Sequence, residues 1–251
     1  MRSPRLAALA LALSLAAACA TAPAPAPAPT PAPATPAPAM SRALHWQRTA
    51  AEHRAVYLQT YEAASRRLEE LAQAQPPFSW AVVLDADETV IDNSTYQKER
   101  EALGEGYTRD SWYAWVARRE ATLLPGALEF LETARSLGGH IAIVTNRDAV
   151  VCLPTEDNLR ALRVPFDAVL CRPMKGDRSK DARFAALQNG TATKHLPPLR
   201  ILLWVGDNVG DFPGGSQALR DAPDAAFEPF GHRWFILPNP AYGSWEENPP
   251  R

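Results

Sequence analysis

The chain has 251 residues with a formal net charge of −2 at pH 7, and 46% of its residues are hydrophobic. This length accommodates one sizeable domain with additional segments. Acidic and basic residues are interspersed, and the sequence lacks the basic stripe of a nucleic-acid-binding surface, so no nucleic-acid polymer is expected as a partner. The five histidines are scattered without ligand spacing, which argues against a zinc enzyme.

The N-terminus has the pattern of an export signal. Arg2 and Arg5 provide a positive start, and the apolar run from Leu6 to Ala18 is too short to span a membrane. The small residues before Cys19 resemble a bacterial lipobox, in which the cysteine is lipidated after cleavage. Ala16 stands where that pattern prefers a larger aliphatic residue, and an ordinary secretory cleavage site is the alternative.

We interpret residues 1–19 as a lipoprotein-type signal peptide and residues 20–40, which are rich in alanine and proline, as a linker. Proline fixes φ and disfavours helix in the residue before it, so the linker is predicted to be an extended polyproline-type spacer. The folded domain then comprises residues 41–251. We expect an exported protein, either an outer-membrane lipoprotein held to the membrane by its N-terminal lipid or a periplasmic protein.

Strands alternate with helices in the folded part. Between Leu44 and Ala74, helical spacing predicts an N-terminal helix with one face on the core, formed by Tyr57, Tyr61, Ala64, Leu68 and Leu71. Thr155 is predicted to cap a shorter helix. The polar, aromatic-rich segment 94–124 is predicted to form a small helical cap. Apolar runs predict strands at residues 79–84, 140–144, 167–170, 201–205 and 233–237. This alternation predicts an α/β fold with a three-layer, doubly wound parallel sheet.

Acidic residues follow the first of these strands. The sequence changes abruptly from apolar to acidic between Val82 and Asn93, as a buried strand does where it delivers side chains to its carboxyl end. Asp85 and Asp87 are spaced i, i+2, so both can face one site if the backbone stays near extended. Gathering carboxylates in this way is unfavourable unless a cation or a reaction uses them.

Further polar clusters follow other predicted strands. In doubly wound sheets, ligands bind at the carboxyl ends of the strands, where the strand order reverses. We therefore expect these clusters to meet at one edge of the sheet. They are Thr145-Asn146-Arg147 after the second strand and Asp207 with Asp211 after the fourth.

Together these groups predict phosphoryl transfer through a phospho-aspartyl intermediate. Asp85 would attack phosphorus as the nucleophile, and Asp87 would protonate the leaving oxygen and later deprotonate water. Thr145 and a lysine would hold the phosphate oxygens. Lys175 and Lys180 are both candidates, and Lys180 is favoured because it begins a helix, whose dipole attracts phosphate.

A hard divalent cation would neutralise the phosphate and the nucleophile, and oxygen ligands indicate Mg²⁺. Asp85 and Asp207 would bind the ion together with the backbone carbonyl of Asp87. Asp211 would be a further ligand or would support one. The predicted metal site therefore comprises Asp85, Asp87, Asp207 and Asp211.

Three stretches carry a family resemblance. They run from Leu84 to Ser94, from Val205 to Phe212 and from Leu237 to Glu246. They are similar to signatures of the class C bacterial acid phosphatases in the haloacid dehalogenase (HAD) superfamily, and the likeness extends over about residues 44–247. The resemblance implies an exported or lipid-anchored, Mg²⁺-dependent enzyme that hydrolyses small phosphomonoesters, 5′-nucleotides among them.

The resemblance also implies how the substrate is held. Aromatic residues in that family form a slot for a flat leaving group, and Tyr96 and Tyr242 occupy the matching positions here. Ordinary packing in the core or at its rim is the alternative for both tyrosines. Asn146 and Arg147, which follow Thr145, are predicted to contact the substrate.

Several alternatives stay open. A phosphotransferase on the same scaffold and a non-enzymatic surface lipoprotein are the competing hypotheses for function. The sequence is compatible with a homo-oligomer but does not require one. Cys152 and Cys171 would form a disulfide in an oxidising compartment, and two buried free thiols are the alternative.

Overall fold

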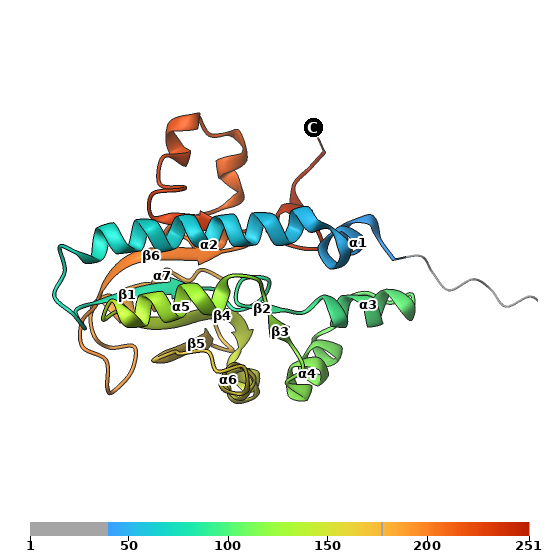
Figure 1. Cartoon of the computed structure of the whole chain (residues 1–251). Coiled ribbons are helices and arrows are strands. Elements are labelled where there is room, and N and C mark those ends of the chain that lie inside the picture. Colours follow the sequence, from blue (N-terminus) through green and yellow to red (C-terminus); the bar gives the residue numbers. More distant parts are fainter. Residues whose placement is uncertain (1–39, 177, 251) are drawn as a thin grey trace, which may run out of the picture. The chain divides into compact units, whose positions relative to one another are not determined.

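The computed structural model describes residues 40–176 and 178–250 (Figure 1). The predicted signal peptide, the lipidation site Cys19 and the linker up to residue 39 lie outside the described residues. Within the described part, no helix combines the length and the apolar character that crossing a membrane requires.

Five parallel strands form the central sheet, in the order β5-β4-β1-β6-β7. The chain passes from β1 to β4 and β5 on one side and then crosses to β6 and β7 on the other, so the strand order reverses at β1. All five residues of β1 are buried, as expected for a central parallel strand. These findings confirm the predicted α/β sheet. The strands are β1 (Trp80–Leu84), β4 (His140–Asp148), β5 (Ala168–Arg172), β6 (Arg200–Gly206) and β7 (Trp234–Ile236).

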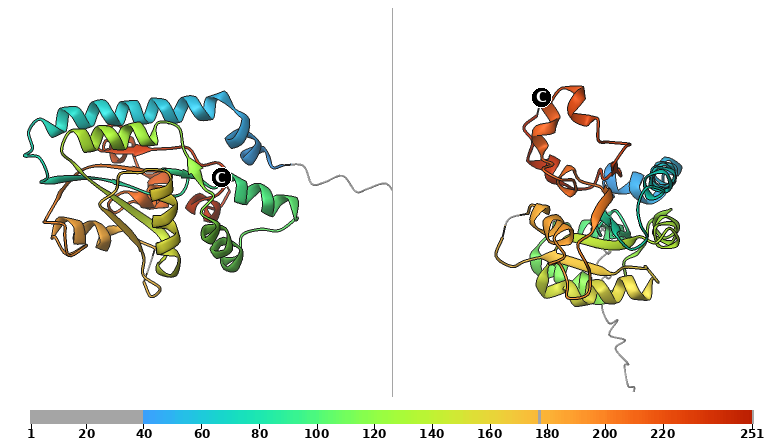
Figure 2. Two further views of the ribbon diagram at one scale, coloured as in Figure 1. Left: turned by 60° about the horizontal axis from the view of Figure 1, so that its bottom comes forward. Right: turned by 90° about the vertical axis from the view of Figure 1, so that its left-hand side faces the viewer.

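Helices cover both faces of this sheet. On one face, α2 and α5 lie side by side (Figure 2), and the rings of Tyr61 and Phe130 contact each other with centroids 5.6 Å apart. Leu159 of α6 joins the same core. On the other face, Phe184 of α7 packs against Trp204 of β6. These helices are α2 (Ala51–Ala72), α5 (Ala127–Ser136), α6 (Cys152–Ala161) and α7 (Asp181–Gln188).

The predicted N-terminal helix is interrupted at Ala50. This residue has an extended backbone, with φ −77° and ψ 132°, and therefore separates α1 (Arg42–Thr49) from α2. α1 contacts a helix of the predicted cap segment instead of continuing along the sheet, and Arg48 donates a 2.6 Å hydrogen bond to the Ser94 hydroxyl. The periodic residues on which the prediction rested, Tyr57 to Leu71, all lie in α2, so they did not indicate the break at Ala50.

The segment predicted to form the cap lies between two short strands. β2 (Ile91–Asp92) and β3 (Thr122–Leu123) pair antiparallel, and the chain between them forms α3 (Ser94–Ala102) and α4 (Arg109–Arg118) (Figure 1). Thr108 and Ser111 form a capping box at the start of α4. Short 3₁₀ helices complete the element list: η1 (Ala149–Val151), η2 (Val209–Asp211), η3 (Gln217–Asp221), η4 (Asp224–Phe227) and η5 (Ser244–Glu247).

The structure corrects two predictions, the end of the second strand at Val144 and the helix N-cap at Thr155. The strand continues four residues beyond Val144, because Asp148 still pairs with Arg172 of β5 after an irregularity in the register. Thr155 is not an N-cap. α6 already begins at Cys152, and the buried Thr155 hydroxyl donates to the carbonyl of Val151 at 2.8 Å, four residues earlier.

Cys152 and Cys171 form a disulfide in the structure. It joins the first residue of α6 to β5 across a sequence separation of 19 residues. Of the two alternatives that the sequence left open, the structure therefore contains the disulfide.

Candidate active site

The nucleophile predicted from the sequence lies at the centre of the carboxyl edge. Asp85 directly follows β1, and its backbone N–H donates to the carbonyl of Val205 at 3.0 Å. β4 and β6 flank β1 in parallel, with Leu84 opposite Ile143 on one side and Val205 on the other. Asp85 therefore occupies the position where the strand order reverses, which is where such sheets bind ligands.

Three carboxylates gather at this edge. One oxygen each from Asp85, Asp207 and Asp211 lies within 4.8 Å of the others. Asp207 follows β6, and Asp211 ends the short helix η2. The close approach needs Gly206, because a Cβ at this position would be 2.4 Å from the Cβ of Asp211. A set of carboxylate oxygens at this spacing fits a hard divalent cation.

Burial and mutual repulsion determine the electrostatics of these groups. Burial, together with the charges of Asp211 and Asp87, raises the pKa of Asp85 to about 7 against the opposing effect of Lys180. Burial, with the charges of Asp211 and Asp85, raises the pKa of Asp207 well above its ordinary value. The cluster therefore favours a positive charge in its midst.

Lys180 supplies a positive charge within the cluster. Its ammonium bonds to Asp85 Oδ1 and lies 2.7 Å from Asp211 Oδ1, and its side chain is 1% exposed. Burial lowers the pKa of Lys180, but Asp211 and Asp85 outweigh this effect and the net pKa is raised, so the lysine is charged. Lys175 is exposed. The geometry therefore favours Lys180 over Lys175 as the lysine of the site.

The carboxylate of Asp87 points to a different partner. Arg147 Nη2 donates to its Oδ1 at 2.7 Å, and Arg147 Nε lies 3.0 and 3.1 Å from its two oxygens. Asn93 Nδ2 donates to the same Oδ1 at 2.8 Å. The Asp87 side chain is thus absent from the three-carboxylate cluster, and only its backbone carbonyl remains as the predicted contribution to a metal site.

Arg147, predicted to contact substrate, is buried beneath the cap segment. Its side chain is 1% exposed, it also donates to Thr155 and Asn93, and its guanidinium lies 5.2 Å from the Trp112 ring centroid. In this structure its Nε and Nη2 groups donate to Asp87. Asn93 is a residue to which sequence analysis gave no role, although it belongs to the first motif.

Thr145 and Asn146, the other two residues of the second cluster, differ in burial. Thr145 is fully buried, and its hydroxyl accepts a 3.1 Å hydrogen bond from the N–H of Arg147, which leaves its own hydrogen to donate. Asn146 is exposed and bonds to the Arg178 carbonyl at 2.9 Å and to Arg183 at 2.7 Å. Alternation along β4 accounts for the difference, because successive side chains point to opposite sides.

Two tyrosines of α2 form hydrogen bonds to the backbone of the loop after β1. Glu88 has a φ of 49°, which is uncommon for a residue with a side chain. The Tyr57 hydroxyl donates to the Glu88 carbonyl at 2.5 Å, and the Tyr61 hydroxyl donates to the Thr89 carbonyl at 2.8 Å. These two tyrosines were predicted from their spacing as core residues only, and the hydrogen bonds add a role in shaping the loop.

The two tyrosines predicted to bind a flat leaving group differ from each other. Tyr96 is 2% exposed, packs edge-on against Trp112 and bonds to Ser111, which matches the packing alternative. The Tyr242 hydroxyl bonds to the buried carboxyl of Glu88. Burial, with the charges of Asp87 and Asp207, raises the pKa of Glu88 well above its ordinary value.

The segment after β7 also reaches the carboxylates. Asn239 Nδ2 donates to Asp207 Oδ2 at 2.8 Å. Asn239 belongs to one of the three stretches that carry the family resemblance, but no role was predicted for it. Its partner lies 32 residues away in sequence, and a proline-flanked asparagine is typical of any turn.

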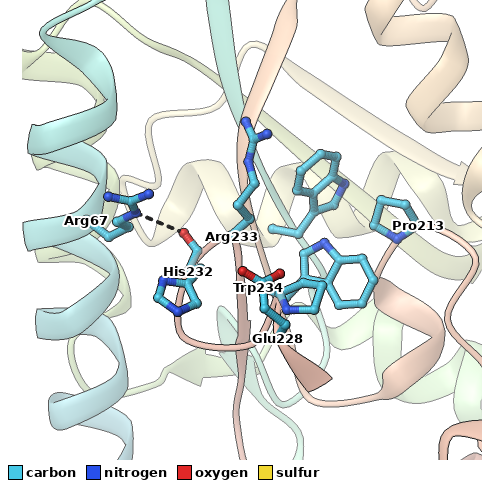
Figure 3. A pocket seen from close by; sticks show the side chains of 8 residues that line it. Arg67, Pro213, Glu228, His232, Arg233 and Trp234 are labelled. Atoms are coloured by element: carbon cyan, nitrogen blue, oxygen red, sulfur yellow. Dashed lines mark hydrogen bonds between the residues drawn. The ribbon is translucent and has the colours of Figure 1, made fainter. Parts of the chain in front are cut away.

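A pocket of about 420 Å³ lies away from these residues (Figure 3). It lies between α2 and the start of β7, where Arg67 Nε donates to the His232 carbonyl at 3.2 Å. None of the predicted site residues lines it. The lining residues are Arg67, Trp204, Pro213, Glu228, Pro229, His232, Arg233 and Trp234.

Comparison with known proteins agrees with this geometry. A model of the HAD superfamily, subfamily IIIB (acid phosphatase) matches residues 8–245. The structure is similar to that of the class C acid phosphatase from Bacillus anthracis, with 32% sequence identity, a TM-score of 0.70 and coverage of 81% of this chain and 85% of that one. The structure of the Bacillus anthracis enzyme with tungstate bound matches at the same identity and coverage, with a TM-score of 0.69.

Proposed function

Because this chain belongs to the class C acid phosphatases of HAD subfamily IIIB, and is thus a phosphomonoesterase, we propose that it hydrolyses small phosphomonoesters, including 5′-nucleotides, with Mg²⁺ and through a phospho-aspartyl intermediate. The observation that carries the proposal is the cluster of Asp85, Asp207, Asp211 and Lys180 at the carboxyl end of β1.

The residues can be given the following roles. An oxygen of Asp85 attacks phosphorus, the bond from phosphorus to the ester oxygen breaks, and Asp87 gives its proton to the leaving oxygen. Asp87 then removes a proton from water, whose oxygen displaces Asp85 and releases phosphate. Lys180 and the free hydroxyl hydrogen of Thr145 stabilise the charged phosphate oxygens.

The three carboxylates suit Mg²⁺ as ligands. Asp85 and Asp207 would hold the ion with the backbone carbonyl of Asp87, and Asp211 would be a further ligand or would orient one. When bound, the ion supplies positive charge that neutralises the phosphate and its attacking carboxylate. Asp87 needs a proton before it can act as an acid, so we expect the highest activity at acidic pH.

The test is a phosphomonoester panel with the purified chain. p-Nitrophenyl phosphate and 5′-nucleotides should be hydrolysed at acidic pH, activity should disappear with a chelator, and Mg²⁺ should restore it. Asp85→Asn and Asp87→Asn should each remove nearly all turnover. Wild-type rates in either variant would overturn the assigned roles.

Two further measurements address the intermediate and the competing hypothesis. Rapid acid quenching during turnover should trap ³²P on the wild-type chain but not on Asp85→Asn. Added alcohols should divert little of the phosphate if water is the natural acceptor, whereas predominant transfer to alcohols would identify a phosphotransferase.

We also propose that the chain is exported and anchored by a lipid on Cys19. The support is the sequence pattern of the N-terminus, which lies outside the described residues. In a bacterial host, a labelled fatty acid should be incorporated into the wild-type chain, and Cys19→Ala should abolish this incorporation. An unlabelled wild-type chain recovered in the soluble periplasmic fraction would instead support ordinary secretory cleavage.

A further inference from the structure

The segment after β7 contacts Asp207, one of the proposed metal ligands. We propose that Asn239 is a positioning residue that fixes the orientation of Asp207 toward a divalent cation, an inference that rests on the metal site of the proposed function. The segment concerned, residues 238–248, is called the C-terminal strap below. Its contacts with the two acidic loops carry the argument.

The amide of Asn239 is fixed at both ends. Its Oδ1 accepts hydrogen bonds from the backbone N–H groups of Ala241 at 3.1 Å and Tyr242 at 3.3 Å. This Asx-type turn leaves Nδ2 to face Asp207 Oδ2 at 2.8 Å. The backbone of the strap therefore determines where the donor lies, and the donor in turn determines where the carboxylate points.

Asp207 is also held from the other side. Thr89 Oγ1 donates to its Oδ1 at 3.2 Å, so each oxygen of the carboxylate has one protein donor. A carboxylate has about four acceptor positions, so one position on each oxygen remains for a cation. The two donors are far apart in the sequence, since Thr89 belongs to the first motif and Asn239 to the strap.

The strap is anchored to the same loops at three other points. The N–H of Leu237, the residue directly before the strap, donates to the carbonyl of Gly206, the residue directly before Asp207, at 2.8 Å. Ser244 bonds to the side chain of Asn208 at 2.9 Å, and the backbone N–H of Asn208 donates to Asp211 Oδ2 at 2.8 Å. The Tyr242 hydroxyl bonds to Glu88. Asn239 is thus held by a fixed framework and is not a mobile surface side chain.

Hydrogen bonds from partners outside the ligand set orient ligating groups, and their loss typically weakens metal binding about 10–100-fold. Removing the amide of Asn239 would leave every predicted ligand in place. We therefore expect weaker binding of the ion with the reaction chemistry preserved once the ion is bound. This separates a positioning role from a catalytic one.

The test uses the full chain without substrate. Isothermal titration with Mg²⁺ alone should give a dissociation constant about 10–100-fold higher for Asn239→Ala than for wild type. At saturating Mg²⁺, kcat for p-nitrophenyl phosphate should return to within a few-fold of wild type. The matched control is Asn248→Ala, in the same strap, whose amide donates to Gln217 at 2.8 Å and to no carboxylate; it should bind Mg²⁺ as wild type does.

Folding is checked by circular dichroism in chelator. If Asn239→Ala does not fold, Asn239→Ser replaces it, because a serine hydroxyl can still accept from the turn but is too short to reach Asp207. Equal Mg²⁺ affinity in wild type and the folded Asn239 variant would overturn the inference. A wild-type chain that binds no Mg²⁺ at all would instead overturn the metal site of the proposed function.

Discussion

The carboxylate of Asp87 is oriented by two side chains that come from different parts of the chain. Arg147 lies 60 residues away on β4, and Asn93 lies in the loop after β2. Asn93 also accepts hydrogen bonds from Arg147 at 3.1 Å and from Trp115 at 2.8 Å, so it links the acid to the cap segment. The aspartate proposed as the general acid is therefore held in one orientation by buried donors.

Replacing Arg147 should impair proton donation more than attack on phosphorus. Arg147→Met is expected to reduce kcat/KM, which reports the steps up to release of the leaving group, by about 10²–10³-fold for an alkyl phosphate, whose leaving group needs a proton. The loss for p-nitrophenyl phosphate should be at least tenfold smaller, because nitrophenolate leaves without help. Steady-state kinetics on the two substrates measure the difference.

The control for this experiment is Arg172→Met. Arg172 forms an ion pair with Asp148 away from the proposed acid, and its loss should affect both substrates equally. Equal losses of kcat/KM on the two substrates in Arg147→Met would show that Arg147 does not assist proton donation by Asp87.

Single side chains also join whole elements of the sheet. Asp167, just before β5, accepts hydrogen bonds from Arg135 of α5 at 2.8 Å and from the N–H of Ile141 in β4 at 2.7 Å. Burial alone would raise the pKa of Asp167, but these two donors outweigh it and the net pKa is lowered. A carboxylate with a lowered pKa stabilises the fold above its unfolded-state pKa of about 3.9 and loses this contribution as the pH falls through its folded-state pKa.

Asp167→Asn should therefore reduce the free energy of unfolding at pH 7 by about 1–2 kcal/mol. The difference between wild type and variant should shrink as the pH falls below about 4. Urea unfolding at pH 7 and pH 3 measures it. Asp157→Asn, which removes a more exposed ion pair with Arg119, should change stability by less than about 1 kcal/mol at either pH. A difference for Asp167→Asn that is constant with pH would show that its charge is not responsible.

The disulfide also connects two elements of the fold, because it joins α6 to β5. Closing a loop of this length in the unfolded chain corresponds to about 3 kcal/mol of stability. The double variant Cys152→Ser, Cys171→Ser should lose about that amount in urea unfolding. Reducing agent should lower the stability of wild type but leave the double variant unchanged. If reduced wild type, verified by thiol titration, were as stable as the oxidised protein, the prediction would be wrong.

The proposed metal site depends on distant parts of the molecule, since its groups come from the end of β1, the loops after β6 and the C-terminal strap. An ion that binds only the folded state adds about 2.7 kcal/mol at a free concentration 100 times its dissociation constant. Mg²⁺ should therefore raise the melting temperature in differential scanning fluorimetry. Asp207→Asn, which removes a proposed ligand, should show little or no rise. A rise of equal size in this variant would place the stabilising ion elsewhere.

The sequence was most informative where local chemistry changes abruptly. An apolar run that ends in acidic residues identified β1 with Asp85 and β6 with Asp207, and the rules of parallel sheets then predicted that the two would meet. Lys180 was preferred over Lys175 from its position at a helix start, and the structure places it between two carboxylates. These predictions needed only neighbouring residues and the general geometry of the fold.

The remaining features depend on partners that no local pattern reveals. Arg147 looked like a substrate contact because it follows Thr145, but its partner Asp87 lies in the loop after another strand, β1. Thr155 precedes acidic residues as an N-cap does, yet the start of α6 lies three residues earlier. Asn239 resembles any turn asparagine until its contact with Asp207 is known.

The contacts of α2 bear on how the protein can be divided. A fragment that started at β1 would retain every acidic residue discussed above and the complete parallel sheet. It would lack the two phenol groups that donate hydrogen bonds to the peptide carbonyls of Glu88 and Thr89, and Glu88 is the residue with the uncommon φ. The smallest competent unit must therefore include the helix that contributes Tyr57 and Tyr61, and boundaries for truncated or fused versions belong upstream of it.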